Sequence, residues 1–413
     1  MDNSITKQNY WLLSTCLFSF FLTWSFAFSL FPIWLKQAIG LTGEQTGLIF
    51  SINAISALFV GPVYGYLQDK FGIKKHLLFL VAFLLICTGP FMIYVYGPLL
   101  QSNFILGALL GGIFSAVTFG CAIGLLESYI ERIGRLSGFE FGKVRMWGSI
   151  GWAVATFFAG KVFNINPDLN FILASLTACI FIVSLIFVKT EVLQSMHDDE
   201  KSKSESVTIY DALNLLKLPD FWGLAVFVIG VTCVYAVYDQ QFPIYFSSLF
   251  STLERGNEMF GYLNAFQVFL EAGGMFLAPF LVNRIGAKNG LIISGIIMAV
   301  RVLGSGFAAD PISISLLKLL HAVELPIMLV SIFKYIAFTF DKRLSATIYL
   351  VGFQFTTQVA ASGLSILAGV MYDNLGFPTS YKIMGAVVTL FVILSWIVLK
   401  PTPIEKLSKE EVG

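Results

Sequence analysis

The sequence has few charged residues and almost no histidine. Charged side chains make up 12% of its 413 residues and histidine occurs three times, whereas 57% of the residues are hydrophobic. A soluble protein of this length cannot hide so much apolar surface, so the lipid bilayer must be its solvent. The formal net charge of +1 says nothing about partners, and no nucleic-acid partner is expected.

The chain also lacks the residue patterns of a disulfide, a metal site or a catalytic centre. Its five cysteines lie singly in apolar segments, which favours buried structural thiols: Cys16, Cys87, Cys121, Cys179 and Cys233. His76 and His197 fall in or near loops, and no nucleophile or metal constellation supports a membrane enzyme. The short tail from Lys400 offers no signalling domain, which argues against a sensor. We therefore expect neither an enzyme nor a cofactor.

Long apolar runs dominate what is present. Twelve stretches are long enough to span a bilayer, roughly 10–34, 43–67, 76–98, 104–130, 145–164, 168–188, 221–248, 258–282, 289–308, 312–339, 345–371 and 379–400. They are too long for β-barrel strands, so the sequence predicts an all-α polytopic membrane protein. Lysine and arginine gather in alternate loops, and the positive-inside rule then predicts that both termini are cytoplasmic.

One polar stretch divides the chain. Residues 189–220 read as a cytoplasmic linker between two six-helix bundles, 1–188 and 221–413. A weak repeat at a shift of 214 relates the halves through Asp69/Asn283, Lys70/Arg284, Gly72/Gly286, Lys74/Lys288 and Gly47/Gly261. Two parallel halves with a substrate site near the midplane are a known transporter plan.

Ionisable residues interrupt several of these apolar runs, where each costs at least about 2.5–3.5 kcal/mol at the bilayer centre. The acids are Glu127, Asp239, Glu271 and Glu324, and the bases are Arg145, Arg301 and Lys318, with His321 taken as neutral. Four acids against three bases leave one carboxylate without a cationic partner, and burial favours its protonated form.

We assign that carboxylate to Glu324, which has apolar neighbours and lies one turn after His321. Arg301 could approach Glu324 in another conformation and release its proton. Lys318 and Asp239 fit a plain structural ion pair equally well.

A second polar group has the chemistry of a sugar site. Arg145 and Trp152 are seven residues apart and share a helix face, and Glu127 could accept hydrogen bonds from sugar hydroxyls or pair with Arg145. An aromatic ring stacks on the apolar face of a pyranose, while a guanidinium presents a planar fork of donors. Gln267 and Glu271 share a face at i, i+4. From spacing alone, an ion pair at a helix end with an interfacial Trp explains Glu127, Arg145 and Trp152 as well.

The loop string from Gly65 to Lys75 resembles that of the major facilitator superfamily. Within it, the chain resembles the oligosaccharide:proton symporters along nearly its whole length, through the strings at 127–131, 138–142, 144–146, 238–242, 318–321 and 343–348. The resemblance implies two pseudo-symmetric six-helix bundles in a bacterial inner membrane, acting as a monomer on a disaccharide and a proton.

The resemblance also implies roles for the candidate residues. Sugar binding falls to Glu127, Arg145, Trp152, Gln267, Glu271 and His321, and proton coupling to Glu324, Arg301, His321, Tyr235, Lys318 and Asp239. Asp69 would control helix movement, although it could simply cap a helix. Gly47 and Gly261 would let helices touch at a periplasmic gate, although ordinary tight packing explains them nearly as well.

Four positions point to a branch of this family. Lactose-type members carry an acid where this chain has Val268 and an Asn where it has Glu271, and a charged pair where it has Ala236 and Thr357. The chain instead resembles the sucrose permeases. Sucrose import is therefore favoured; the alternatives are a galactoside, a raffinose-type sugar or an uncoupled sugar facilitator.

Overall fold

The structure, a computed structural model, describes residues 3–71, 74–189, 217–340 and 348–402. Within these ranges every regular element is an α-helix or a short π-helical segment, and there is no strand. The prediction of an all-α chain is confirmed for this part of the molecule. Most of the expected linker, residues 190–216, lies outside the described residues.

The chain forms two compact units. Unit 1 comprises Met1–Glu205 with Phe250–Val268, and unit 2 comprises Ser206–Leu249 with Phe269–Gly413. The long helix α15, Leu253–Ile285, therefore contributes its first half to unit 1 and its second half to unit 2.

The other elements of unit 1 are α1 (Asn3–Phe28), α2 (Phe31–Trp34), η1 (Leu35–Ile39), α3 (Gly43–Phe71), α4 (His76–Ile86), α5 (Thr88–Phe91), η2 (Met92–Tyr96), α6 (Gly97–Ser102), α7 (Phe104–Ser115), η3 (Ala116–Gly120), α8 (Ala122–Ser137), α9 (Phe141–Ile165) and α10 (Pro167–Phe187). Those of unit 2 are α13 (Pro219–Phe227), η4 (Val228–Cys233), α14 (Val234–Ser248), α16 (Ala287–Phe307), α17 (Pro311–Leu319), α18 (His321–Thr339), η6 (Tyr349–Phe355) and α20 (Thr356–Val398).

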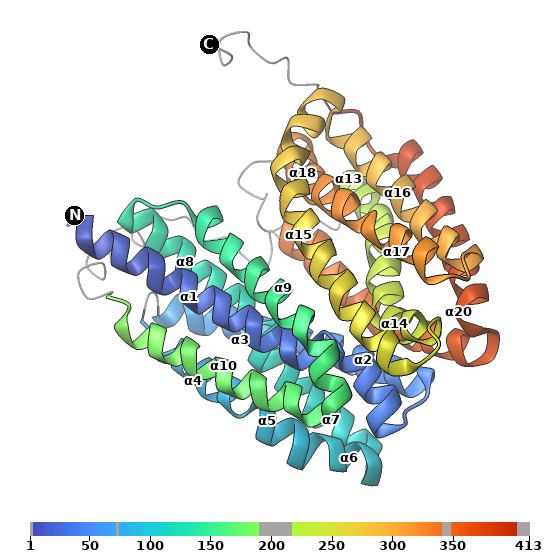
Figure 1. The fold of residues 1–413 in the computed structure, drawn as a ribbon. Helices are drawn as coiled ribbons and strands as arrows, with labels where there is room; N and C mark the ends of the chain where they lie inside the picture. The colour runs from blue at the N-terminus through green and yellow to red at the C-terminus, as the bar shows by residue number, and fades with distance from the viewer. Residues whose placement is uncertain (1–2, 72–73, 190–216, 341–347, 403–413) are drawn as a thin grey trace. The chain divides into compact units, whose positions relative to one another are not determined.

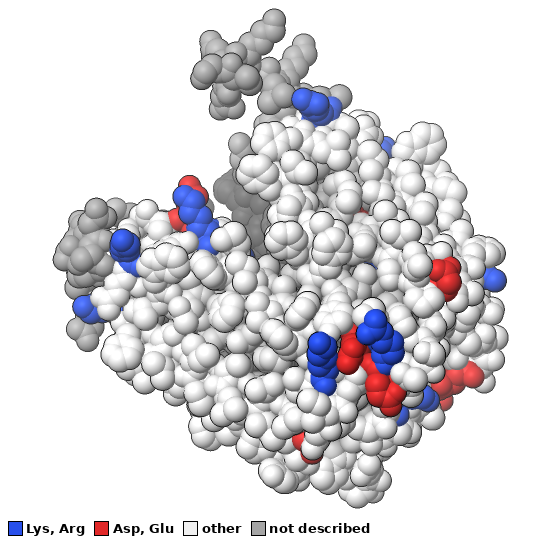
Figure 2. All heavy atoms as spheres, viewed as in Figure 1, with Lys and Arg blue, Asp and Glu red and all other residues white. Residues whose placement is uncertain are grey.

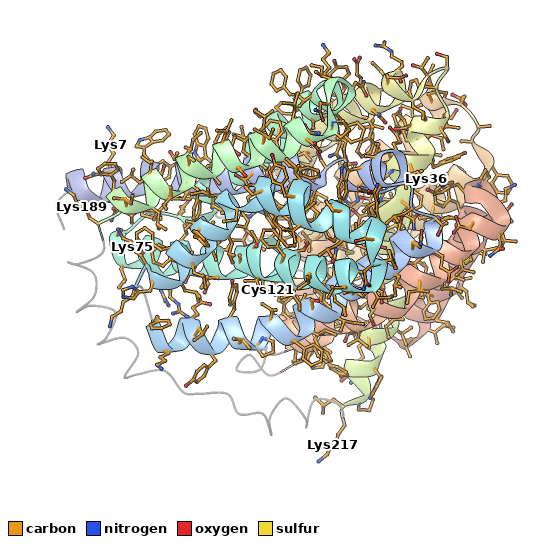
Figure 3. The ribbon with its side chains drawn as sticks, turned by 90° about the horizontal axis from the view of Figure 1, so that it is seen from below. Lys7, Lys36, Lys75, Cys121, Lys189 and Lys217 are labelled. Carbon is orange, nitrogen blue, oxygen red and sulfur yellow. The ribbon has the colours of Figure 1, made fainter. Side chains whose placement is uncertain are left out.

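In unit 1, helix α1 packs against α9 and α10 (Figure 1). Helices α1 and α9 approach each other closely: a Cβ at Gly151 would stand 2.2 Å from the carbonyl oxygen of Phe18, so only glycine fits at that position. The Lys75 ammonium donates to the carbonyl oxygens of Leu185 and Ile186 at the end of α10, at 3.0 and 3.1 Å. Figure 3 shows Lys75 at one end of the unit 1 helices and Lys36 at the other.

In unit 2, helix α16 packs against α18 and α20. A Cβ at Gly385 of α20 would lie 2.6 Å from Leu303 of α16, so a glycine is needed there. Asp310 begins α17 by accepting hydrogen bonds from the backbone of Ile312 and Ser313 at 3.0 and 2.9 Å. Hydrogen bonding to Ser313 and to the backbone of Ile312 lowers the pKa of this exposed carboxyl.

Nine of the described helical stretches are long and apolar enough to cross a membrane, or ten if the pair His76–Ile86 and Thr88–Ser102, bent by 50°, counts as one span. The expectation of twelve separate stretches differs at two places. Helix α9, which holds the fifth expected span, is not among them. The eleventh and twelfth spans belong to one stretch, Val351–Val398, which is interrupted at Gly376, where φ is 74°.

The outer surface agrees with a bilayer environment. Phe59, Phe269 and Phe276 are 74%, 73% and 73% exposed, and Figure 2 shows mostly uncharged surface over the helices. All five cysteines are free. Cys16 and Cys233 are buried and Cys87 and Cys121 are partly buried, but Cys179 on α10 is exposed, so the expectation that every thiol is buried is wrong there.

Helical irregularities adjoin the segments that carry candidate residues. The π-helical segments η3 and η4 come just before α8 and α14, and α17 and α18 are separated at Leu320. A π-helical turn rotates the residues that follow it relative to a regular helix, and such turns are frequent at functional sites. Each irregularity is followed by candidate residues: η3 by Glu127, η4 by Tyr235 and Asp239, and the break at Leu320 by His321 and Glu324.

Candidate functional site

Five side chains from four helices meet inside unit 2. Asp239 comes from α14, Arg301 from α16, Lys318 from α17, and His321 and Glu324 from α18. We call them the ion cluster. Arg301 and Glu324 are fully buried, and Lys318 and His321 nearly so. The sequence-based prediction grouped these residues by chemistry, and the structure brings them into contact.

Arg301 is the centre of the ion cluster. Its Nη1 donates to Glu324 Oε2 at 3.0 Å and to His321 Nδ1 at 3.1 Å. A guanidinium only donates, so Nδ1 is the acceptor and the proton of neutral His321 lies on Nε2. That nitrogen donates to the Tyr235 hydroxyl at 2.7 Å. The sequence placed Arg301 near Glu324 in another conformation, whereas here the two already touch.

Asp239 is shared by two cations. Its Oδ1 pairs with the Lys318 ammonium and lies 3.5 Å from Arg301 Nη2. The Asp239 side chain is 32% exposed, whereas that of Lys318 is 2% exposed. Lys318 therefore depends on Asp239 more than Asp239 depends on Lys318.

Aromatic rings enclose the cations. The Arg301 guanidinium lies 5.0 Å from the Tyr235 ring and 5.3 Å from the Tyr238 ring, and the Lys318 ammonium lies 5.1 Å from the Phe242 ring. Cation–π attraction is strongest where water is excluded, so these rings stabilise charge that the bilayer would otherwise penalise.

The Glu324 carboxyl uses only one of its oxygens. Oε2 accepts from Arg301, while Oε1 is buried without a hydrogen-bond partner among the described residues. A buried carboxylate is stable only when it is paired and hydrogen-bonded. The geometry therefore permits two states of this group, an anion against Arg301 and a neutral acid away from it.

A second group of candidates meets in unit 1. Glu127 on α8 forms an ion pair with Arg145 on α9, and the two side chains are 31% and 34% exposed. The Arg145 guanidinium lies 4.5 Å from the Phe21 ring of α1. The Trp152 ring meets that of Trp24 edge to face at 5.7 Å. This arrangement offers an aromatic wall beside donors and acceptors that water or a ligand can reach.

Sequence reasoning missed Phe21 and Trp24. Their signal is an aromatic-rich run, Phe18 to Trp24, with rings three residues apart. Aromatic residues are common throughout this chain, so the run alone does not distinguish a ligand wall from lipid-facing packing.

The α9–α15 seam, also within unit 1, is a line of close contacts from Asn164 to Thr156 on α9 and from Glu254 to Asn264 on α15. A Cβ at Gly160 would stand 2.4 Å from the Asn257 carbonyl oxygen, and one at Gly261 would stand 2.6 Å from that of Thr156. Gly261 was a sequence candidate; Gly160, Thr156 and Asn257 were not.

Hydrogen bonds between amides reinforce one end of the seam. Asn257 Nδ2 donates to Gln37 Oε1 at 3.0 Å and to Asn164 Oδ1 at 3.1 Å, and Gln37 Nε2 returns a bond to Asn257 Oδ1 at 3.2 Å. Asn164 Nδ2 donates to the Glu254 carbonyl oxygen at 2.7 Å. We call Gln37, Asn164 and Asn257 the amide triad.

The remaining candidates are dispersed. Gln267 is buried on the unit 1 part of α15, and Glu271 is partly buried on the unit 2 part. Gly47 is buried on α3. Asp69 lies near the end of α3, and its side chain is outside the described residues.

Apolar helices that enclose an ion cluster define the class of this protein: a membrane transporter. The sequence profile described as LacY proton/sugar symporter matches residues 3–411, and the chain belongs to that family. The resemblance to the oligosaccharide:proton symporters, and the prediction that the chain is no enzyme, are confirmed.

Named relatives match this chain over 90% or more of its length. The sucrose permease of Escherichia coli is 41% identical over 385 residues, which cover 93% of this chain and 92% of the permease. The lactose permease of Klebsiella oxytoca is 42% identical over 375 residues, 90% of each chain, and the raffinose permease of Escherichia coli is 38% identical over 407 residues, 98% of this chain and 96% of the permease.

Solved structures show the same fold at low identity. The crystal structure of the nucleoside transporter NupG has a TM-score of 0.77 and 16% identity, covering 94% of this chain and 98% of that one. Its likeness supports the transporter fold and carries no information about the substrate.

Proposed function

We propose that this protein imports a disaccharide, with sucrose favoured, together with a proton. It would work by alternating access of two six-helix halves, as a monomer in a bacterial inner membrane with both termini in the cytoplasm. The observation that carries the proposal is Glu324, fully buried and hydrogen-bonded through one oxygen to Arg301, in a chain of the proton/sugar symporter family.

We count twelve spans by taking the irregular helices separately. The nine apolar stretches include Val351–Val398 as one, which Gly376 divides into two. With that division, the bent pair at residues 76–102 and helix α9 bring the proposed number to twelve. The halves would be residues 1–188 and 221–413, joined by 189–220.

The sugar would bind through its hydroxyls and through one apolar face. Trp152 would stack on a ring, and Arg145 and Glu127 would exchange part of their mutual contact for hydroxyl groups. Gln267, Glu271 and His321 would supply further donors and acceptors. Such a site stabilises a bound sugar because every charged or polar group that the sugar desolvates gains a hydrogen bond to the sugar.

The proton would travel on Glu324. With Glu324 protonated, Arg301 keeps Asp239 as its partner, and the ion cluster carries one net positive charge. Contact between Arg301 and Glu324 would favour proton release, with His321 and Tyr235 linking this step to the sugar. One charge moved across 100 mV gains about 2.3 kcal/mol and tenfold accumulation costs about 1.4 kcal/mol, so one proton supports roughly 40-fold accumulation.

The preference for sucrose rests on four positions, since the relatives' names do not separate the sugars. The identities to a sucrose and a lactose permease are 41% and 42%. Val268, Glu271, Ala236 and Thr357 depart from the lactose-type pattern. Loss of both members of a buried charge pair avoids leaving one charge stranded.

External pH in lightly buffered, de-energised vesicles tests the whole proposal. Sucrose should make the medium alkaline, and lactose and melibiose should have smaller effects. A response to galactosides alone would leave symport standing and remove the sucrose preference. Sugar uptake without any pH change would instead establish an uncoupled facilitator.

The proton carrier has its own test. Glu324→Gln should abolish sucrose accumulation while sucrose exchange across the membrane continues, because a fixed neutral side chain allows sugar movement but cannot release a proton. Glu131→Gln is the matched control, since Glu131 is 48% exposed and pairs only loosely with Arg135 at 3.7 Å. Accumulation that persists in Glu324→Gln would remove Glu324 from this role.

A further inference from the structure

Two amide side chains lie one turn apart on helix α15, beyond the glycine contacts of the seam. They are Asn264 and Gln267, and both belong to unit 1. Neither amide is ionisable, so neither can take part in proton transfer. Their surroundings indicate a role in hydrogen bonding to a ligand instead.

Asn264 is held by helix α9. Its Nδ2 donates to Thr156 Oγ1 at 3.1 Å, and Thr156 is fully buried. This bond leaves the second N–H and the Oδ1 carbonyl of Asn264 for other partners. Thr156 lies four residues after Trp152, so the two share a face of α9.

Gln267 has an unmet hydrogen bond. The side chain is 4% exposed, and its Oε1 has no hydrogen-bond partner among the residues that the structure describes. Buried polar atoms in native proteins almost always have a partner. A hydroxyl group of a bound molecule is a donor of the right kind.

The register of the two helices brings both amides near Trp152. Asn164 contacts Glu254, Gly160 approaches Asn257, and Thr156 approaches Gly261 and bonds to Asn264. The helices are therefore antiparallel: as residue numbers fall by one turn along α9, the residue numbers of the facing positions on α15 rise by one turn. One further turn places Trp152 level with residues 264–268.

We propose that Asn264 and Gln267 form an amide subsite that binds hydroxyls of the sugar unit next to the one on Trp152, and so selects among oligosaccharides. This proposal rests on the sugar transport proposed above. The amides offer both donors and acceptors to hydroxyl groups, and their hydrogen bonds are the same whichever way Glu324 is protonated. Thr156 is a positioning residue that orients Asn264.

Transport by purified protein in proteoliposomes tests the subsite, with sucrose, raffinose, lactose, glucose and fructose as competitors. Gln267→Met and Asn264→Leu keep the side-chain size and remove the hydrogen bonds. Each should weaken sucrose competition about three- to tenfold and change its ratio to the other oligosaccharides, with less effect on the monosaccharides. Thr156→Val should change the same ratio to a smaller extent.

The number of protons moved per sugar should stay at the wild-type value in all three variants. Asn289→Leu is the control, because Asn289 is an exposed amide near the start of α16 whose Nδ2 donates to the Ile285 carbonyl oxygen, at the end of α15, at 2.8 Å. Equal weakening of all five sugars would indicate a structural role, and an unchanged profile would indicate that water satisfies Gln267; either overturns the subsite. If the wild type transports no oligosaccharide, the proposal of sugar transport is wrong and the subsite proposal is wrong with it. Failure of the subsite alone would appear only in the variants, with the wild type still transporting oligosaccharides, so the two outcomes can be told apart.

Discussion

Because Asp239 contacts both Lys318 and Arg301, removing Asp239 and removing Lys318 should have unequal effects on stability. Asp239→Asn removes the acid that contacts Lys318 and leaves a cation that is 2% exposed. Lys318→Met leaves Asp239 with Arg301 Nη2 at 3.5 Å and with partial access to solvent. The first change should therefore destabilise the protein more than the second.

The magnitudes follow from the burial of the partner left behind. Breaking a buried ion pair from one side costs about 3–5 kcal/mol, which applies to Asp239→Asn. A partly exposed carboxylate that retains a cation should lose only about 1 kcal/mol, which applies to Lys318→Met. The double variant strands no charge and should resemble Lys318→Met, so the two changes should couple by roughly 3–5 kcal/mol.

Denaturant unfolding of the purified protein in detergent measures all three variants. The exposed pair Glu140 and Lys143, 76% and 66% exposed, provides the control as Glu140→Gln and Lys143→Met, which should change little. A larger loss for Lys318→Met than for Asp239→Asn, or additive single changes, would refute the argument from shared charge.

Three further changes probe other contacts. Arg145→Lys keeps the charge but loses the planar fork, so sugar affinity should fall about tenfold while protein amount is unchanged; unchanged competition by sucrose would contradict this. Gly261→Val puts a side chain against the Thr156 carbonyl, so transport should fall sharply; normal uptake would exclude a tight seam. Tyr235→Phe removes the hydroxyl that accepts from His321, so accumulation should fall more than exchange, and equal losses would argue against a coupling role.

The sequence was sufficient for the class of fold and for the members of the ion cluster. Charge in an apolar run is costly, so Arg301, Lys318 and Glu324 stand out without any structure. The sequence does not show which of these residues contact one another. Arg301 and Glu324 are 23 residues apart on different helices. Only the packing of α16 against α18 shows that they touch rather than meet in another conformation.

Neutral residues were harder to assign. Thr156, Asn257 and Asn264 are ordinary polar residues of membrane helices, where a hydrogen bond to a neighbouring helix is the commonest role. Phe21 and Trp24 are two among many aromatic side chains. The helix count also depended on geometry, since Gly376 divides one continuous stretch and α9 is not among the helices that are long and apolar enough to span.

The amide triad consists of groups that do not titrate at any physiological pH. Acid or alkali therefore leaves the bonds among Gln37, Asn164 and Asn257 unchanged. Charged side chains occur on the same parts of α9 and α15: Arg255 pairs with Glu258 at 3.5 Å, and the Lys161 ammonium lies 5.7 Å from the Tyr262 ring. Salt weakens such interactions. The chain thus uses two kinds of polar contact in different places: amides that carry no charge hold the α9–α15 seam, and ionisable side chains meet in the ion cluster of unit 2.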